Sequence, residues 1–389
     1  MSPASRIIPG VPGPNIPALA LLLGLTVACS SGLRPLRAGE SASVPAAGLA
    51  HDRDLTRGVL TYAVAFADDH TLVSVELETA FALVVRDLAA GESVETLRAP
   101  LGPAEYDIDD LAISHDHELA WVTSRAGTVR AIALRGGETR VTWHLGSGAT
   151  AVALTPDGQY IALGTEDGII CLRRLTDQAL LQCVAAHEDR ISELTFDRTS
   201  SQLASSSWDG RVVLWQVPTL ATRASLEIAG SANGVAFDPS GRRIAIATST
   251  RIPRRTPEID RREQRGDAKD TDDAVILWSL NEGDDGAQGS QASLRGHRGP
   301  VTRVAWTPDG TGLLSVSWDR TVTMWDTRID ARTAVVARVE GFSALIRDLA
   351  IDRRGSLVAV GAWTRSLDAR SSTLLHLLYP TNQDPDVDE

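Results

Sequence analysis

The sequence lacks the motifs that would point to nucleotide chemistry or to nucleic-acid binding. It has no G-x-x-x-x-G-K-[ST] motif and no strand-linked G-x-G-x-x-G motif, so nucleotide binding has no support. Lys269 is the only lysine, and the formal net charge is -12. Because phosphate neutralisation dominates affinity for nucleic acid, an acidic chain argues against a nucleic-acid partner. We also expect no cofactor and no small-molecule substrate.

The chain also lacks an apolar run long enough to cross a bilayer as a helix. Its longest candidate, "ALALLLGLTVA" at residues 18–28, has 11 residues, which fits the core of a signal peptide. Cys29 follows at once, and "LTVAC" resembles a bacterial lipobox. The resemblance implies that residues 1–28 are removed, that Cys29 is lipidated, and that residues 29–48 form a tether. A plain secretory signal or a short hydrophobic tail is the alternative interpretation.

An internal repeat is the main positive feature. "SSSWDGRVVLW" at residues 205–215 returns as "SVSWDRTVTMW" at residues 315–325. Aligned apolar segments give seven copies of one unit, spaced 41 to 47 residues apart, except for one step of 69. The excess lies in the charged segment 251–273. The third residue of the apolar segment in each copy is Phe66, Ile113, Leu154, Phe196, Phe237, Trp306 or Ile351.

Each unit predicts four short strands. In the sixth copy, "VTRVAW", "GLLSVSW", "TVTMWD" and "TAVVARV" are separated by turn residues such as "TPDG". Four strands in forty-odd residues are typical of one propeller blade. We therefore predict an all-β fold, a seven-bladed β-propeller of four-stranded antiparallel blades over residues 49–380. Residues 251–273 would be a loop insertion in blade 5, and residues 381–389 a disordered tail.

These repeats resemble the WD-repeat β-propeller family. The resemblance implies a structural chain of hydrogen bonds between a loop His, a strand Ser, a turn Asp and a strand Trp. The matching residues are His187, Ser207, Asp209, Trp215, His297, Ser317, Asp319 and Trp325, with Asp272 and Trp278 as a partial set. It also implies that an N-terminal strand completes the last blade, with residues 42–51 as the candidate.

Two alternative chemistries were weighed against this structural interpretation. Ser207, His187 and Asp209 could suggest a hydrolase triad, but no G-x-S-x-G elbow is present and the set occurs twice. "SHDHE" at residues 114–118, with His70 at a matching turn, could suggest a metal site at the rim. A solvated turn is the simpler interpretation, so we expect no metal site.

The two internal cysteines leave a choice open. Cys171 and Cys183 fall on consecutive predicted strands, equally distant from Asp177. A disulfide is possible in an exported protein, and two free buried thiols are the alternative.

The family resemblance also implies where partners bind, namely the end of the ring that carries the tight Asp turns. The residues before those turns should face outward: Glu166, Trp208, Thr271, Trp318 and Trp363. Residues flanking the start of the first strand should do the same: Arg190, Ser192, Pro300, Thr302, Asp107, Asp109, Leu345 and Arg347. The insertion carries Arg254 and Arg255, which would either belong to a docking arm or to a solvated loop.

The expected function is a non-catalytic scaffold that binds one or more proteins. The chain would be exported and lipid-anchored in the bacterial envelope, on the periplasmic face of the outer membrane or on the cell surface. One alternative is a periplasmic subunit of an envelope-assembly or transport complex. Another is an enzyme that uses the centre of the ring. The enzyme would need polar residues converging on the axis, and first-strand patterns such as "VAWT" and "VALT" predict none there.

Overall fold

The computed structural model describes nine segments of the chain, all within the compact unit Gly32–Glu389. They are residues 47–57, 59–88, 93–103, 107–250, 273–280, 290–328, 335–342, 344–363 and 373–382, with residue 343 and the other gaps outside the description. The predicted signal peptide, Cys29, most of the predicted tether, and the tail beyond residue 382 therefore lie outside the described residues. In the described part of the chain, no helix is both long and apolar enough to span a membrane.

The described residues form 28 strands in seven four-stranded antiparallel sheets, which we number as blades in chain order. Blade 1 consists of β2 (Leu60–Phe66), β3 (Thr71–Leu77), β4 (Ala80–Asp87) and β5 (Val94–Pro103). Blade 2 consists of β6 (Ile108–Ile113), β7 (Leu119–Ser124), β8 (Thr128–Ala133) and β9 (Thr139–His144). Blade 3 consists of β10 (Ala149–Leu154), β11 (Tyr160–Thr165), β12 (Ile169–Arg174) and β13 (Leu180–Ala185). Blades 4 and 5 are β14 (Ile191–Phe196), β15 (Gln202–Ser207), β16 (Arg211–Gln216), β17 (Ala221–Glu227); and β18 (Ser231–Phe237), β19 (Arg243–Ser249), β20 (Ala274–Ser279), β21 (Gln291–Arg295). Blades 6 and 7 are β22 (Val301–Trp306), β23 (Gly312–Ser317), β24 (Val322–Asp326), β25 (Val335–Val339); and β26 (Leu345–Ile351), β27 (Val358–Trp363), β28 (Thr373–Asn382), β1 (Ala47–Arg57).

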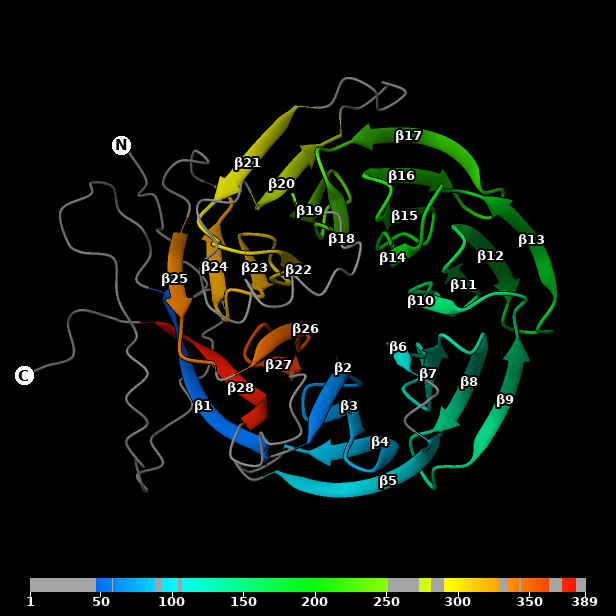
Figure 1. Ribbon diagram of the computed structural model, residues 1–389, viewed down its shortest axis with the longest axis horizontal. Helices are drawn as coiled ribbons and strands as arrows, with labels where there is room; N and C mark the ends of the chain where they lie inside the picture. The colour runs from blue at the N-terminus through cyan, green and yellow to red at the C-terminus, as the bar shows by residue number, and fades with distance from the viewer. Residues whose placement is uncertain are drawn as a thin grey trace, which may run out of the picture. The chain divides into compact units, whose positions relative to one another are not determined.

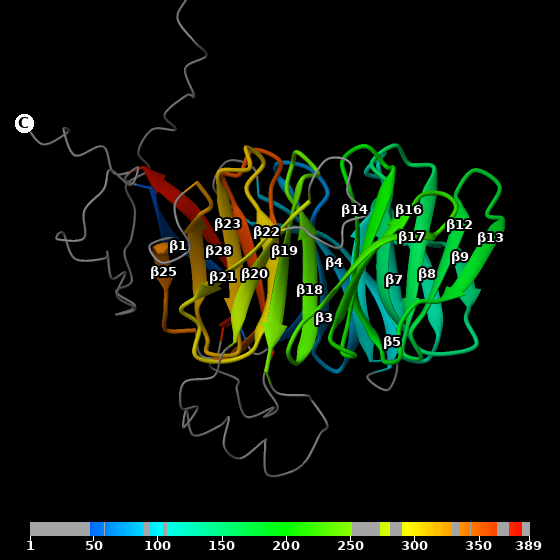
Figure 2. The same ribbon diagram turned by 90° about the horizontal axis from the view of Figure 1, so that it is seen from above.

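The sheets are arranged in a ring (Figure 1). The first strand of each blade lies innermost, and consecutive first strands contact one another from β2 round to β26 and back to β2. Seen from the side, the strands run between the two ends of the ring (Figure 2). The predicted all-β propeller of four-stranded antiparallel blades is therefore confirmed.

Blade 7 is completed by the N-terminal strand, as the family resemblance implied. β1 pairs antiparallel with β28, with Ala47 opposite Asn382 and Arg57 opposite Thr373. The closing strand overlaps the predicted candidate, residues 42–51, from Ala47 to His51 and continues to Arg57. β28 likewise extends to Asn382, two residues beyond the predicted end of the ring.

Local sequence explains the regularity of the blades. In blade 6, β22 has the bounds predicted from "VTRVAW". The turn that follows ends at Gly310, whose φ of 72° favours glycine, and the Gly310 N–H donates to the Thr307 carbonyl at 2.8 Å. β-branched and leucine side chains on the middle strands face neighbouring sheets, so the core is a set of layers between blades.

All seven blades share one irregularity at the start of the first strand. The register between first and second strands shifts by one residue there, which is the pattern of a β-bulge. The residues skipped by the pairing are Tyr62, Asp109, Thr150, Ser192, Asn233, Thr302 and Arg347. Because the first strands are innermost, each bulge re-aims its side chains near the ring axis.

Candidate functional site

A chain of side-chain hydrogen bonds crosses blade 4 from a surface turn to the core. Nδ1 of His187 lies 2.9 Å from Oδ2 of Asp209, and Nε2 of His187 lies 2.7 Å from Oγ of Ser205. The indole Nε1 of Trp215 donates to the same hydroxyl at 2.9 Å. His187 and Ser205 are buried, so this chain joins a loop, a turn and two strands out of reach of water.

Blade 6 repeats the arrangement. His297 lies 3.0 Å from Asp319 and 2.7 Å from Ser315, and Trp325 donates to Ser315 at 2.7 Å. Burial acts to raise the pKa of Asp319. The hydrogen bond and charge of His297, with the backbone N–H of Arg298, outweigh burial and lower that pKa to about 2. The aspartate is therefore held ionised at the end of the chain.

The predicted serines were wrong in both blades. Ser207 donates to the Asp189 carbonyl at 3.1 Å and accepts the backbone N–H of Asp209 at 3.1 Å, so it shapes the turn. Ser317 makes the equivalent bonds at the end of β23. Residues two apart on a strand share a face, so both serines point the same way. In blade 4, only the earlier serine, Ser205, lies within hydrogen-bond distance of both the histidine and the indole.

This geometry does not support a hydrolase. The hydroxyls that contact His187 and His297 belong to Ser205 and Ser315, which are fully buried and already accept an indole N–H. A nucleophile must be reachable by a substrate and needs an oxyanion site beside it. The chain of bonds therefore holds the blade together.

Blade 1 fills the same position without a histidine. By strand register, Ser74 corresponds to Ser205 and Arg86 to Trp215. Nη1 of Arg86 donates to Oγ of Ser74 at 2.9 Å and pairs with Glu76, which is fully buried. Ser74 in turn donates to Oε1 of Glu76 at 2.7 Å. A buried ion pair thus takes over the role of the imidazole and the indole.

Blade 5 keeps part of the family pattern. Trp278 is buried between blades 4 and 5, as a core residue. The predicted turn residue Asp272 lies outside the described residues. Its neighbour Asp273 accepts the backbone N–H of Thr250 at 2.7 Å and its hydroxyl at 3.0 Å. The two ends of the insertion are thereby held together.

We call one end of the ring the b–c face, because it carries the turns between second and third strands, including Trp208–Asp209 and Trp318–Asp319. Glu166 is exposed at this face, and Trp208 and Trp318 are half-buried. The guanidinium of Arg190 stacks on the Trp208 ring, 4.7 Å from its centroid. Both indoles therefore retain accessible surface, although Trp208 has one face covered.

Other predicted partner-binding residues cannot be placed on that face. Trp363 ends β27, but its side chain lies outside the described part of the structure. Arg254, Arg255 and Thr271 belong to the insertion, which also lies outside the described residues. Their assignment to the partner-binding face stays a prediction.

Residues expected to point outward at the start of the first strands instead turn inward. Arg190, Ser192 and Asp109 are only 8%, 7% and 3% exposed. Ser192 and Asp109 are the bulge residues of their blades, and the bulge re-aims these two side chains toward the axis, while Arg190 reaches Asp109 from the position before β14. Oδ2 of Asp109 accepts from Nε of Arg125 at 2.9 Å and from Nη2 of Arg190 at 3.2 Å, and Oδ1 accepts from Nη2 of Arg347 at 2.9 Å.

This group, Arg125, Arg190 and Arg347 around Asp109, is the arginine cluster. Its members come from blades 2, 4 and 7, which meet only at the axis (Figure 1). Burial acts to raise the pKa of Asp109, but the three guanidinium charges outweigh it and lower that pKa. One ionised carboxylate is therefore shared by three arginines.

A second polar group, the acidic cluster, lies one residue further along the first strands. It comprises Asp110, Glu193, Asp348 and Arg303. Nε of Arg303 lies 3.4 Å from Oδ1 of Asp348 and 3.8 Å from Oε1 of Glu193. Each carboxylate also accepts a backbone N–H from the next first strand round the ring. The donors are Val152, Val235 and Val64, at 2.9, 2.8 and 2.8 Å.

Burial dominates the electrostatics of the acidic cluster. It raises the pKa of Glu193 to about 8 and that of Asp110 to about 6, against the opposing charge of Arg303. Gly234 lies beside Glu193 in space, and a Cβ at this glycine would lie 2.7 Å from Oε2 of Glu193. The small residue leaves room for the carboxylate.

The expectation that no polar residues converge on the axis was therefore wrong. The signal was present as polar residues at one place in four units, in "IDDLAI", "ISELTF", "VTRVAW" and "LIRDLAI". The patterns on which the prediction rested, "VAWT" and "VALT", begin later in the first strand and miss these positions. The carboxylates found there are bonded to backbone N–H groups and to arginine, as in a structural network.

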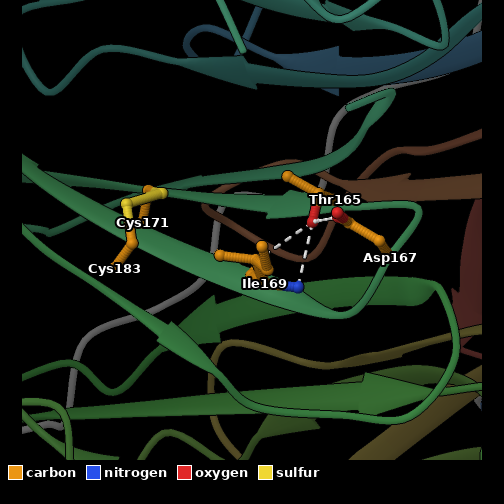
Figure 3. Close-up of a disulfide and its surroundings, with 5 residues drawn as sticks. All are labelled: Thr165, Asp167, Ile169, Cys171 and Cys183. Atoms are coloured by element: carbon orange, nitrogen blue, oxygen red, sulfur yellow. Dashed lines mark hydrogen bonds between the residues drawn. A yellow bond between two sulfur atoms is a disulfide. The ribbon is translucent and has the colours of Figure 1, made fainter. Parts of the chain in front are cut away.

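Cys171 and Cys183 form a disulfide (Figure 3). They are direct cross-strand partners on β12 and β13. On the same blade, the hydroxyl of Thr165 donates to Asp167 at 2.5 Å and accepts the N–H of Ile169 at 2.9 Å. Blade 3 thus keeps the Asp turn of the family pattern beside a covalent link between its two outer strands.

The histidine-rich turn of blade 2 contacts protein groups. Nε2 of His117 lies 2.7 Å from Nη2 of Arg353, and Ser114 donates to Asp116 at 2.5 Å. His70 donates its backbone N–H to Asp68 at 2.8 Å. Among the residues that the structure describes, no group of three or more His, Cys, Asp and Glu side chains could hold a metal ion.

Comparison with known families supports the WD-repeat assignment. Residues 138–173, 178–216 and 288–326 match the family model "WD domain, G-beta repeat". Each match begins at or before the outer strand of one blade and continues through the first three strands of the next. These matches and the ring of four-stranded sheets support a WD-repeat β-propeller.

Curated relatives agree with this assignment. The chain is 26% identical over 189 residues to "Periodic tryptophan protein 2 homolog" of Schizosaccharomyces pombe, covering 46% of this chain and 20% of that protein. It is 24% identical over 276 residues to "Angio-associated migratory cell protein" of Homo sapiens, covering 67% of this chain and 57% of that protein. It is 24% identical over 152 residues to "THO complex subunit 3" of Arabidopsis thaliana, covering 38% of this chain and 48% of that protein.

The chain spans between a fifth and three-fifths of the length of these relatives. All three organisms are eukaryotes, and the relatives give no support to a bacterial lipoprotein signal peptide. One relative is named as the subunit of a complex.

Proposed function

We propose that this chain is a non-catalytic protein-interaction scaffold that uses the b–c face of its ring. The observation that carries the proposal is the pair of half-buried indoles, Trp208 and Trp318, at equivalent turns two blades apart. Trp is among the residue types that dominate binding energy at protein interfaces. The polar chains beneath the turns, His187–Asp209 and its counterpart in blade 6, fix the loops that present these rings.

The proposal extends to export and a lipid anchor on Cys29. The disulfide between Cys171 and Cys183 supports export, because disulfides form and persist mainly in oxidising compartments. Cys29 is the one remaining cysteine of three, and it follows the apolar segment directly. The anchor would hold the propeller in the bacterial envelope, at the periplasmic face of the outer membrane or at the cell surface.

The anchor is tested by fractionating cells that express the full chain. Wild type should be extracted from membranes with a mature N-terminus at a diacylated Cys29, as measured by mass spectrometry. The control is Cys29→Ala, which should lack the lipid and keep the folded ring. An intact Met1, or a mature N-terminus at another residue, would refute the anchor without touching the scaffold.

The docking face is tested by affinity purification of the tagged, solubilised chain. Trp208→Ala and Trp318→Ala should each reduce capture of the co-purifying protein about tenfold or more, as expected of interface hot spots. The matched control is Trp143→Ala on the outer strand β9, where Arg173 stacks 4.6 Å from the ring centroid as Arg190 does on Trp208. Equal capture by all three variants would place the binding surface elsewhere.

The insertion is tested in the same assay. Reversing the charge of Arg254 and Arg255 together should slow association and weaken its salt dependence, because rim charges act mainly on association rates. Unchanged association kinetics would assign the insertion to a solvated loop with no part in docking.

A further inference from the structure

The arginine cluster has a hydrogen-bond donor that its own contacts do not use, on Arg190. Three guanidinium groups share one buried carboxylate, Asp109; a second carboxylate, Asp107, lies 3.2 Å from Nη1 of Arg125, and the charge of Glu166 also acts on Arg125. We propose that this cluster binds a carboxylate side chain of an acidic peptide segment on a protein partner. The proposal rests on the scaffold function and names the chemistry that the b–c face would recognise.

Arg190 is the most telling member of the cluster. Its side chain is nine-tenths buried, and among the described residues its guanidinium donates one hydrogen bond, from Nη2 to Asp109. Its Nε is buried and has no hydrogen-bond partner in the described structure. A buried donor without a partner costs about 1–3 kcal/mol. An added acceptor at this place would remove that cost.

Repulsion between the arginine charges of the cluster also favours binding of an added carboxylate. Burial lowers the pKa of Arg190, Asp109 raises it, and the charges of Arg125 and Arg347 lower it again, with a net shift downward. The charged form of Arg190 is therefore less stable than in water. A second carboxylate would favour that charged form through forked N–H···O contacts, which match the planar guanidinium.

The guanidinium planes are already held in place. Arg190 stacks on Trp208, and the guanidinium carbon of Arg347 lies 4.8 Å from the centroid of the Tyr62 ring. The side chains of Arg125 and Arg347 remain 26% and 28% exposed, so both can be reached from the b–c face. A site whose donors are oriented before binding loses less conformational entropy when the ligand arrives.

The acidic cluster sets the depth of the site. Asp110 follows Asp109 in the chain, and Asp110, Glu193 and Asp348 gather around a single Arg303. An anion that passed beyond the arginine cluster would meet these carboxylates. An acidic side chain would therefore stop at the outer layer, which favours a peptide lying across the b–c face over a small anion deep in the ring.

The test uses a fluorescein-labelled hexa-aspartate peptide with capped ends, followed by anisotropy at about 50 mM salt. A capped hexa-asparagine peptide is the neutral probe. Wild type should bind hexa-aspartate with an affinity that falls as salt rises. Arg125→Gln and Arg347→Gln should each weaken binding about tenfold or more. These two arginines are partly exposed, so the variants should keep the fold, and thermal melts check this.

The matched control is Arg353→Gln, which removes the same charge from an exposed turn at the opposite end of blade 7. Its affinity should stay within about twofold of wild type. If Arg353→Gln weakens binding as much as Arg347→Gln, or if hexa-asparagine binds as well as hexa-aspartate, the proposal is wrong. Displacement of the peptide by inorganic phosphate at lower concentration than by acetate would also overturn the assignment to a carboxylate.

The outcome is separable from the scaffold proposal. A partner captured through Trp208 and Trp318, with no hexa-aspartate binding, would refute the carboxylate site and keep the scaffold. Peptide binding that depends on Arg347 would support the site even where no partner is captured from cells.

Discussion

Blades 1 and 4 place a buried serine at the same strand position and satisfy it in different ways. In blade 4, Ser205 is bonded to a histidine that reaches a surface turn, so core and b–c face are connected. In blade 1, Ser74 is bonded to Arg86 and Glu76, and the polar group continues to the partly exposed Arg98 and Glu95 on the outer strand β5. The fold therefore requires only that the hydroxyl be paired, while the histidine chain adds the support of a loop.

The largest expected effect comes from breaking the pair in blade 1. Glu76→Gln removes the nearest carboxylate from the buried Arg86 and leaves only Glu95, 3.8 Å away; breaking a buried ion pair costs about 3–5 kcal/mol. Urea unfolding should show this decrease in the free energy of unfolding. The control is Glu138→Gln, which alters the exposed pair with Arg140 in blade 2 and should cost less than about 1 kcal/mol. Equal effects of the two variants would mean that burial of the pair is unimportant.

Removing the turn aspartate in blades 4 and 6 should cost less. Asp209→Ala and Asp319→Ala each remove the carboxylate that pairs with Nδ1 of a buried histidine, at about 1–3 kcal/mol. The matched control is Asp167→Ala in blade 3, where the aspartate accepts from Thr165; we expect a smaller loss, below about 1 kcal/mol. Urea melts compare the three, and an Asp209→Ala protein as stable as wild type would contradict the role of the chain.

The same aspartate should make blade 6 sensitive to acid. The pKa of Asp319 falls from 3.8 to about 2 on folding. Its stabilisation is therefore complete above about pH 4 and is lost as the pH falls toward 2. One pKa unit corresponds to about 1.4 kcal/mol, so the loss is about 2 kcal/mol. Unfolding of Asp319→Asn should depend less on pH in this range, and an unchanged slope would contradict the shift.

The position of the paired serine can be tested directly. Ser205→Ala should cost about 1–2 kcal/mol and leave the indole N–H of Trp215 without its acceptor. Its indole proton should then shift and exchange faster, as seen by NMR. Ser207→Ala should leave that proton unchanged, since Ser207 contacts the turn. If Ser207→Ala shifts the indole proton and Ser205→Ala does not, then Ser207 is the bonded serine, as the sequence analysis had assigned.

The smallest effect should come from deleting residues 251–271 in blade 5. Thr250 already bonds to Asp273, so a short connection can replace the insertion with little strain. Long surface loops close at small entropic cost. We expect a change below about 1 kcal/mol in urea melts. A large loss would show that the insertion packs on the ring.

The sequence predicted the repeating parts of this molecule well. Turn residues and apolar strands recur in each unit, so the bounds of β22 could be assigned to the residue. The choice between Ser205 and Ser207 could not be made, because both face the same side of β15. That choice depends on which serine hydroxyl the indole of Trp215 reaches from the neighbouring strand, and spacing alone does not contain this information.

The axis of the ring was harder to predict for a different reason. Alternation along a strand says which side chains share a face, but one bulge shifts that pattern by a residue. Asp109 and Ser192 therefore turn inward from positions that a regular strand would expose. Arg303 and Asp348 meet only after the chain has closed the ring, and no local pattern connects blades 6 and 7 with blade 2.

The pairing of β1 with β28 has a consequence for the order of events during synthesis. Of the described strands, β1 leaves the ribosome or a secretion pore first and β28 last, so Ala47 cannot pair with Asn382 until the end of the process. Until β28 has been made, β1 lacks the strand with which it pairs, and an unpaired strand edge is prone to join another chain. Contacts so distant in the chain also form slowly. The risk of aggregation should therefore be greatest in the interval before β1 pairs with β28, and a chaperone that covers the unpaired strand would be most effective then.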